Sequence, residues 1–362
     1  MMDPQKKQYA MVDVMKFVFA CFIILLHLPS SMSRPTWLTY DYANITEVIR
    51  TFVVCPVMRL GVPFFFTASG YFLFRKAERA ENKKQVIITY IKRSLILYGI
   101  WFVINIVYVV ECRGLNFFMP GHQTIGNLLH FIHEFLFAST FGASWFLMAC
   151  MIDAMILGIV LYGIKSEKLA WIISIAGFII CCMTTNYSPL SECNYIGRLI
   201  LKIDSRIIDF HLSFLCGLIY FMIGRAIGKY ESSIKISTKK LCLITVAAFL
   251  LMIAEFLFLD KVVKSDVIGN TSLMLPVVAA LLMILCIKCE TEYKQWYSFL
   301  RNASIIMYCS HRSVFMCLKI VSERYFFLST FAVYILCITI CLTFAWIIIG
   351  LSRKYKIFKY LY

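Results

Sequence analysis

Ten long apolar segments constrain the fold of this chain more than any other feature. A helix that crosses a bilayer needs about 20 mostly apolar residues. Segments of this kind are expected at 11–28, 54–74, 87–110, 143–163, 169–186, 209–227, 241–259, 272–288, 303–321 and 328–351. Of the 362 residues, 61% are hydrophobic and 15% are charged, whereas a soluble domain has roughly 45–50% and about 25%. The segments are continuously apolar rather than alternating, which excludes membrane strands. The sequence predicts an all-α, polytopic membrane helix bundle.

The positive charges lie mostly on one side of these segments. With the N-terminus inside, the predicted cytoplasmic segments hold 23 Lys and Arg residues and the outer segments hold ten. Cytoplasmic loops of membrane proteins carry such an excess, so both termini are expected in the cytoplasm. The same bias accounts for the net charge of +16 without a nucleic-acid partner. The run from Met11 to Leu28 lacks a small-x-small cleavage pattern, which favours a retained span over a cleaved signal.

Residues 1–362 are expected to form a single membrane domain with no appended soluble domain. The shorter, amphipathic stretch 124–139 is typical of an interfacial or re-entrant helix. It carries His130 and His133, but they have no evident third ligand, so no metal is expected. Most cysteines lie in apolar runs without metal-ligand spacing. Cys112 and Cys193 fall in two predicted outer loops, where a disulfide is one possibility.

Ionisable residues within the first predicted span are candidates for function, because charges at membrane depth are costly and usually face a cavity or a partner. Asp13, Lys16 and His27 lie within about 60° of one another around the helix. Lys16 and His27 are about 16 Å apart along its axis. Alternatively, Asp13 and Lys16 reach the cytoplasmic interface and His27 is an interfacial residue.

Later spans carry further ionisable residues. Asp153 lies near the middle of its predicted span, whereas Glu255 lies close to the outer end of its own, so Asp153 is the stronger candidate. His311 and Arg312 lie mid-span. A buried arginine needs a counter-charge, which we expect from Asp153 or Asp13. A purely structural ion pair explains the same residues equally well.

Several of these motifs together resemble the acyltransferase family 3 membrane proteins. That family opens with an acidic residue, a basic residue three positions later and a histidine after ten more, a pattern matched by Asp13, Lys16 and His27. A second hallmark, several Phe followed by Ser-Gly, is similar to FFFTASGYF at 64–72, which contains Ser69. The family's arginine near the start of the next helix is matched by Arg93 in YIKRSLILYGIW.

Weaker similarity extends over the rest of the chain, in SWFLMACMIDAM, CGLIYFMIGRAIGK and SIIMYCSH. Two positions depart from the family pattern. Lys16 stands where the family usually has arginine, which loses the bidentate fork for phosphate and keeps a point charge. Ile96 stands where a second arginine is often found.

The resemblance implies an enzyme of the cell (inner) membrane that moves an acyl group, usually acetyl from acetyl-CoA, to a hydroxyl of a cell-surface glycan or lipid-linked sugar. Lys16, Arg93 and Ser69 would then bind the acyl-CoA donor, with help from the basic cluster at 75–93. A hydroxyl acceptor needs a base near neutral pH, a role that suits His27. Asp13 and Asp153 would complete the catalytic group.

Two alternatives remain at this point. One is a transporter of a small polar solute, although the sequence has no evident internal repeat and no pair of broken helices in matching halves. The other is a catalytically inactive relative, which the substitution of Lys16 for arginine would allow.

Overall fold

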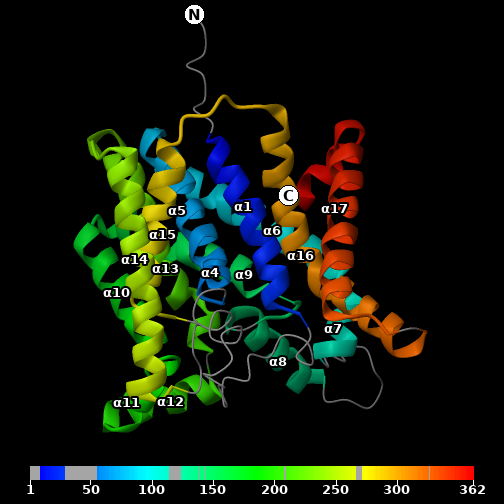
Figure 1. The fold of residues 1–362 in the computed structure, drawn as a ribbon, viewed down its shortest axis with the longest axis horizontal. Coiled ribbons are helices and arrows are strands. Elements are labelled where there is room, and N and C mark those ends of the chain that lie inside the picture. Colours follow the sequence, from blue (N-terminus) through cyan, green and yellow to red (C-terminus); the bar gives the residue numbers. More distant parts are fainter. Residues whose placement is uncertain are drawn as a thin grey trace, which may run out of the picture.

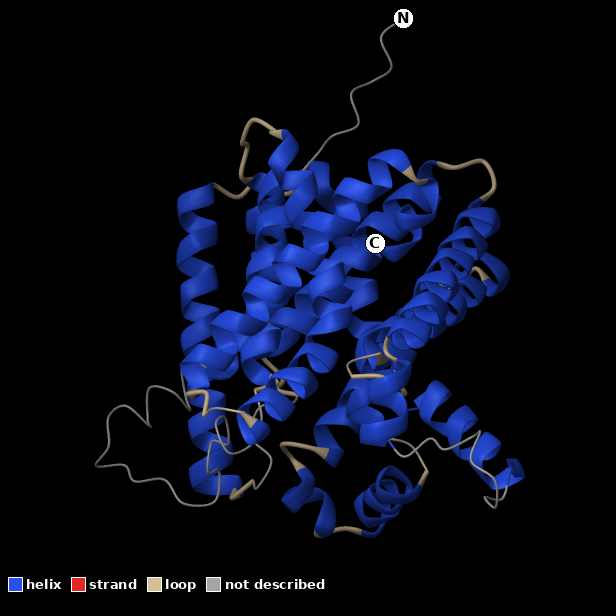
Figure 2. Ribbon diagram, turned by 90° about the vertical axis from the view of Figure 1, so that its right-hand side faces the viewer, coloured by secondary structure: helices blue, strands red, loops and turns tan. Residues whose placement is uncertain are grey.

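The computed structural model describes residues 9–28, 55–113, 124–137, 139–142, 144–207, 209–265, 271–325 and 327–362. Every regular element in these ranges is a helix, as Figure 2 shows. The α-helices are α1 (Ala10–Leu26), α4 (Cys55–Arg59), α5 (Gly61–Arg79), α6 (Lys83–Ile104), α7 (Ile106–Arg113), α8 (Thr124–Phe137), α9 (Trp145–Gly158), α10 (Glu167–Thr184), α11 (Ser188–Glu192), α12 (Tyr195–Arg206), α13 (Phe214–Tyr230), α14 (Thr238–Phe258), α15 (Leu275–Lys288), α16 (Gln295–Arg324) and α17 (Thr330–Lys354). Short 3₁₀ or π turns are η2 (Ile159–Ile164), η3 (Phe210–Leu212), η4 (Glu231–Ser233), η5 (Leu259–Val263) and η6 (Lys356–Leu361).

The predicted membrane helix bundle is confirmed. Seven helices in the described part of the chain are long and apolar enough to cross a membrane. The other three expected spans correspond to α1 and α13, of 17 residues each, and to α15, of 14 residues. The number of ten crossings and the cytoplasmic position of both termini stay predictions.

Polar caps set several of the helix boundaries. The side chain of Asn82 accepts a hydrogen bond from Gln85 N at the start of α6, and Ser166 accepts one from Leu169 N at the start of α10. Such caps satisfy backbone N–H groups that have no partner within the helix. Glu255 serves the start of α15 from another helix, because its carboxylate accepts hydrogen bonds from Leu273 N at 2.6 Å and Met274 N at 2.9 Å. This contact gives Glu255 a structural role.

Helices α5 and α13 form the closest contact of the bundle. A Cβ added at Gly70 would lie 2.5 Å from the main-chain oxygen of Phe221, and one added at Gly224 would lie 2.5 Å from Tyr71 N. Only glycine allows the two backbones to approach in this way, as small residues do between membrane helices. Helix α13 also packs against α9 and α10, and α1 packs against α16.

Three of the shorter helices lie together at one end of the bundle (Figure 1). Helices α8, α11 and α12 lie at the end opposite to the start of α1. The predicted helix at 124–139 is confirmed as α8. Helices α11 and α12, within 187–208, were not predicted. Cys193 carries a free thiol, and the Cys112 side chain lies outside the described residues.

Candidate active site

A cavity of about 460 Å³ opens among α1, α5, α6, α9 and α16. Much of its wall is apolar, with contributions from Phe65, Phe72, Leu73, Leu97, Leu147 and Ile305. Four basic side chains from four helices also line it, namely Lys16, Lys76, Arg93 and Arg301. An apolar cavity with a few convergent charged groups is the usual form of a site for a small anionic ligand.

Lys16 and Asp13 occupy the same end of α1 but have different roles. The Lys16 ammonium lies 5.1 Å from the centre of the Phe72 ring, a cation–π contact at the cavity wall. Asp13 is buried and forms an ion pair with Arg301, with 3.5 Å between Oδ2 and Nη1. Asp13 therefore orients Arg301, which lines the cavity from α16.

Tyr293 completes this arrangement. Its hydroxyl donates a hydrogen bond to Asp13 Oδ2 at 2.8 Å. Burial, and to a smaller extent the hydrogen bond to Asp13, raise the pKa of Tyr293 to about 12. The phenol is therefore a hydrogen-bond donor throughout the physiological pH range, and it holds the Asp13 carboxylate in place.

Arg93 and the last turn of the described chain close one side of the cavity. Arg93 Nη2 donates to the main-chain oxygen of Tyr362 at 3.0 Å, and Trp101 Nε1 donates to that of Leu361 at 3.1 Å. Tyr362 itself lines the cavity. These bonds fix the guanidinium of Arg93 at the cavity edge.

Ser69, Tyr90 and Cys150 form a polar strip on the cavity wall, from α5, α6 and α9 respectively. Ser69 was predicted to bind the donor, and its position in the cavity is compatible with that role. The apolar pattern around Cys150 had favoured a simple packing role for this thiol, whereas the structure also places it at the cavity surface.

Three aromatic rings form the inner end of the cavity. The ring centre of Tyr308 lies 5.4 Å from that of Phe146 and 6.2 Å from that of Phe65. On its other side, the Tyr308 ring centre lies 6.1 Å from that of His311. Tyr308 therefore contacts both the cavity and the residues beyond it.

A pair of histidines lies beyond these rings. His27, at the end of α1, and His311, on α16, have their ring centres 5.1 Å apart, with 3.2 Å between His27 Nδ1 and His311 Nε2. His311 is fully buried and His27 is half-buried. The guanidinium groups of Arg59 and Arg312 lie within electrostatic range of His27.

Contacts with main-chain carbonyl oxygens show which ring nitrogen of each histidine carries a proton. His311 Nδ1 lies 2.7 Å from the oxygen of Tyr308, and a carbonyl oxygen only accepts, so His311 Nδ1 carries a proton. In the neutral ring, His311 Nε2 is then an acceptor. His27 Nδ1 lies 2.9 Å from the oxygen of Ile23 and therefore also carries a proton, which it shares with His311 Nε2. The neutral His27 ring is left with an unprotonated Nε2 that can act as a base.

The expected counter-charges for Arg312 are wrong. The carboxylate oxygens of Asp153 are fully buried and have no hydrogen-bond partner in the described part of the chain, and Oδ2 lies against Gly217 of α13. Asp13 pairs instead with Arg301, which precedes Arg312 by about 16 Å of helix. Asp153 is not among the cavity-lining residues, and its catalytic role stays a prediction.

The structure adds Arg301 and His311 to the site. The sequence had assigned neither of them a donor-binding or catalytic role. Arg301 had been counted only among the cytoplasmic charges, and His311 had been considered mainly as a neighbour of Arg312. The available signal was their spacing on α16, where Arg301 precedes His311 by ten positions, much as Lys16 precedes His27 on α1. In the described residues, no group of three or more His, Cys, Asp or Glu side chains is arranged to hold a metal ion.

Comparison with known proteins decides the family. A family model described as an acyltransferase domain matches residues 9–350. The chain belongs to acyltransferase family 3. Its apolar helices and this family membership together indicate a multi-pass membrane protein. The resemblance seen in the sequence motifs is thereby confirmed.

Two relatives of this chain from Enterococcus faecalis are both named amino-acid racemase. One is 21% identical over 358 residues, which cover 96% of this chain and 47% of the relative. The other is 27% identical over 153 residues, which cover 42% of this chain and 18% of the relative. The chain thus spans less than half the length of these curated relatives. No solved structure matches it.

Proposed function

We propose that this chain is an acyltransferase that moves an acyl group, in the first instance acetyl, from acyl-CoA to a hydroxyl of a cell-surface glycan or lipid-linked sugar, in the cell membrane. The supporting observation is the cavity with four basic side chains, whose inner end contacts the His27–His311 pair through Tyr308. The basic residues suit the phosphates of coenzyme A. The apolar wall suits its uncharged pantetheine arm.

The His27–His311 pair provides the base that the reaction needs. In the proposed step the acceptor oxygen attacks the thioester carbonyl, a C–O bond forms and the C–S bond breaks. His27 Nε2 takes the hydroxyl proton and returns it to the departing CoA thiolate, so that the free thiol leaves. His311 Nε2 accepts a hydrogen bond from His27 Nδ1, which keeps His27 in the reactive tautomer as the positive charge develops.

Donor binding should depend on Arg301, which Asp13 orients. We expect Arg301→Gln to weaken the binding of CoA about tenfold, because a charge-assisted hydrogen bond to phosphate contributes roughly 1.5–3 kcal/mol. Thermal stabilisation of the purified chain by CoA measures this. Lys294→Gln is a matched control about two turns before Arg301, at a residue that does not line the cavity. Equal CoA affinity in the two variants would exclude Arg301 from the donor site.

The catalytic role is tested with His27→Ala. Purified protein with labelled acetyl-CoA and membrane lipid-linked acceptors should give a labelled product, and the variant should give none. CoA binding should persist in His27→Ala, because the basic residues are unchanged. If the variant keeps full transfer activity, His27 is not the base.

A second candidate function is movement of a small polar solute. It is favoured by the alignment of nearly the whole chain with about half of a protein named amino-acid racemase, since an amino acid is such a solute. Uptake of a labelled amino acid into proteoliposomes without CoA would support it. Acyl transfer together with CoA-dependent stabilisation would support the enzyme instead.

A further inference from the structure

A second cavity, of about 450 Å³, lies between α5 and α13 and is separate from the candidate active site. It is lined by Phe74, Arg75, Glu78, Arg79, Arg225, Gly228 and Lys229. Its basic residues form two pairs with a spacing of four, one on each helix, so each pair lies on one helix face. The cavity is at the end of the bundle that carries the N-terminus of α1, since Tyr9 and Tyr71 both donate to Glu231, which follows α13.

The two helices that frame this cavity are in direct backbone contact. The glycine contacts at Gly70 and Gly224 fix the distance between the two backbones. Gly228 continues the same line into the cavity, where a Cβ would lie 3.4 Å from the Tyr71 ring, an ordinary contact distance. The basic side chains are therefore carried by two helices whose backbones are in direct contact.

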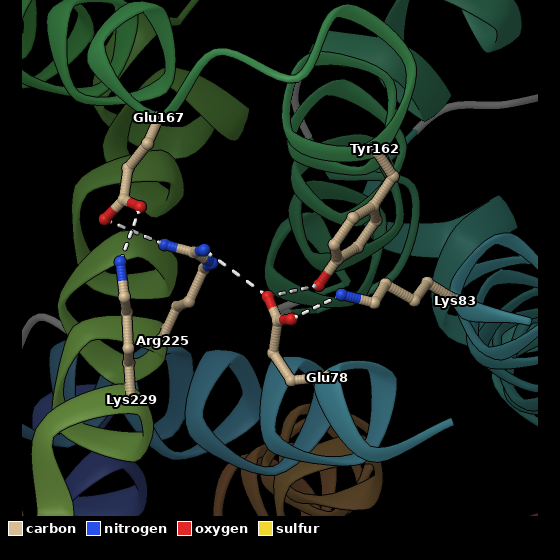
Figure 3. A network of polar contacts seen from close by, with 6 residues as sticks. All are labelled: Glu78, Lys83, Tyr162, Glu167, Arg225 and Lys229. Atoms are coloured by element: carbon tan, nitrogen blue, oxygen red, sulfur yellow. Dashed lines mark hydrogen bonds and ion pairs between the residues drawn. The ribbon is translucent and has the colours of Figure 1, made fainter. Parts of the chain in front are cut away.

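Arg225 lies at the centre of an ionic network that holds its guanidinium toward the cavity. Its Nη1 lies 3.1 Å from Glu167 and its Nη2 lies 3.3 Å from Glu78, as Figure 3 shows. Lys229 also pairs with Glu167, at 2.8 Å, and Lys83 pairs with Glu78, at 2.7 Å. Arg225 is 9% exposed, and its Nε has no hydrogen-bond partner among the residues that the structure describes.

The charges around the cavity do not balance. The charged residues that line it, together with their ion partners, comprise five cations, Arg75, Arg79, Lys83, Arg225 and Lys229, against three acids, Glu78, Glu167 and Glu231. Arg79 forms no ion pair with any residue in the described ranges. A cavity with a net charge of +2, and with a buried Nε–H that has no partner among the described residues, is suited to binding an anion.

We propose that this cavity binds a phosphate group, and that the headgroup of an anionic phospholipid in the adjacent leaflet supplies it. The cavity opens at the helix ends beside the basic cluster at 75–93, where headgroups meet a membrane protein. Basic clusters at this level bind anionic lipids, each cation contributing about 1 kcal/mol. The proposal is independent of acyl transfer, and no CoA enters its test.

The test measures the thermal midpoint of the full chain in neutral detergent during titration with phosphatidylglycerol, phosphatidylcholine or inorganic phosphate. We expect saturable stabilisation by phosphatidylglycerol and none by phosphatidylcholine. Arg79→Gln should weaken the phosphatidylglycerol effect about fivefold, and Arg79→Lys should restore most of it. Arg79 is exposed and forms no described ion pair, so neither variant should impair folding.

Two control variants assign the effect to this cavity. Lys84→Gln removes an exposed charge that lines neither cavity, and Arg301→Gln removes a charge from the first cavity only. Both should keep the response to phosphatidylglycerol. An equal loss in Arg79→Gln and Lys84→Gln, or equal stabilisation by phosphatidylcholine, would overturn the proposal. Equal stabilisation by inorganic phosphate, lost in Arg79→Gln, would keep the phosphate site but reject the lipid as its source.

Discussion

The two histidines differ in what surrounds them, and this difference separates their roles. His311 is fully buried, and its Nδ1 is bound to a main-chain oxygen within its own helix. His27 lies at the end of α1, and its Nε2 forms no hydrogen bond with the described residues. A base must reach the proton that it removes, so His27 is the better base and His311 the residue that positions it.

We expect His311→Leu to lower kcat about a hundredfold while leaving the KM for acyl-CoA unchanged, because the variant loses the acceptor for His27 Nδ1 but no contact with the donor. His311→Gln offers a carbonyl acceptor in a similar place and should recover a large part of the loss. Steady-state kinetics with labelled acetyl-CoA measure both parameters. A parallel rise in KM, or no recovery with Gln, would assign His311 to packing alone.

Contacts of this kind lie beyond the reach of sequence reasoning. His27 and His311 are 284 positions apart, and Asp13 and Arg301 are 288 apart. Helical periodicity shows which residues share a face of one helix, but not which other helix that face meets. His311 and Arg312 are adjacent, so their side chains point about 100° apart, and the sequence alone could not tell which of them faces α1.

At the scale of elements, helices α1 and α16 act as a unit. The Asp13–Arg301 ion pair joins the first turn of α1 to the second turn of α16, and the His27–His311 contact joins the end of α1 to the middle of α16. Both helices therefore run in the same direction, and each carries a cation before an imidazole. Helices α5 and α13 are joined differently, by direct backbone contact at Gly70 and Gly224.

We expect Gly224→Ala to lower the thermal midpoint by several degrees, because its Cβ would lie 2.5 Å from Tyr71 N and the helices would have to separate. Gly99→Ala is the matched control, since a Cβ there meets nothing within 4 Å. At Gly99 alanine should leave stability unchanged or raise it by up to about 1 kcal/mol through helix propensity. Thermal unfolding in detergent compares the two variants. Equal midpoints would mean that the α5–α13 contact adapts.

The apolar runs predicted the long helices well, because a span must be continuously apolar whatever it packs against. They did not predict α11 and α12, since a helix with one polar face lacks such a run. The lengths of α1, α13 and α15 were also uncertain from sequence, because polar residues at their ends blur the boundary between helix and loop.

At the scale of the whole molecule, the two ends of the bundle carry exposed thiols that report its orientation. Cys193 follows α11 and Cys289 follows α15, and both are exposed. The end with α11 is opposite to the start of α1 in Figure 1. The predicted topology places Cys193 outside and Cys289 in the cytoplasm.

A membrane-impermeant maleimide added to intact cells should therefore label Cys193 and not Cys289. Cys193→Ser should reduce the labelling of intact cells, whereas Cys289→Ser should reduce it only after the cells are permeabilised. Mass spectrometry of the purified protein quantifies each modified peptide. Labelling of Cys289 in intact cells would reverse the proposed orientation.

The cavity and the histidine pair are arranged one after the other along the axis of the bundle. On the proposed function, the nucleotide-bearing part of the donor never leaves the compartment in which it is synthesised, and only its small acyl fragment changes sides. The outer cell surface has no acyl donor of its own, so cytoplasmic thioesters would supply the groups that modify it. The free thiol of CoA would remain in the cytoplasm, where it can be acylated again.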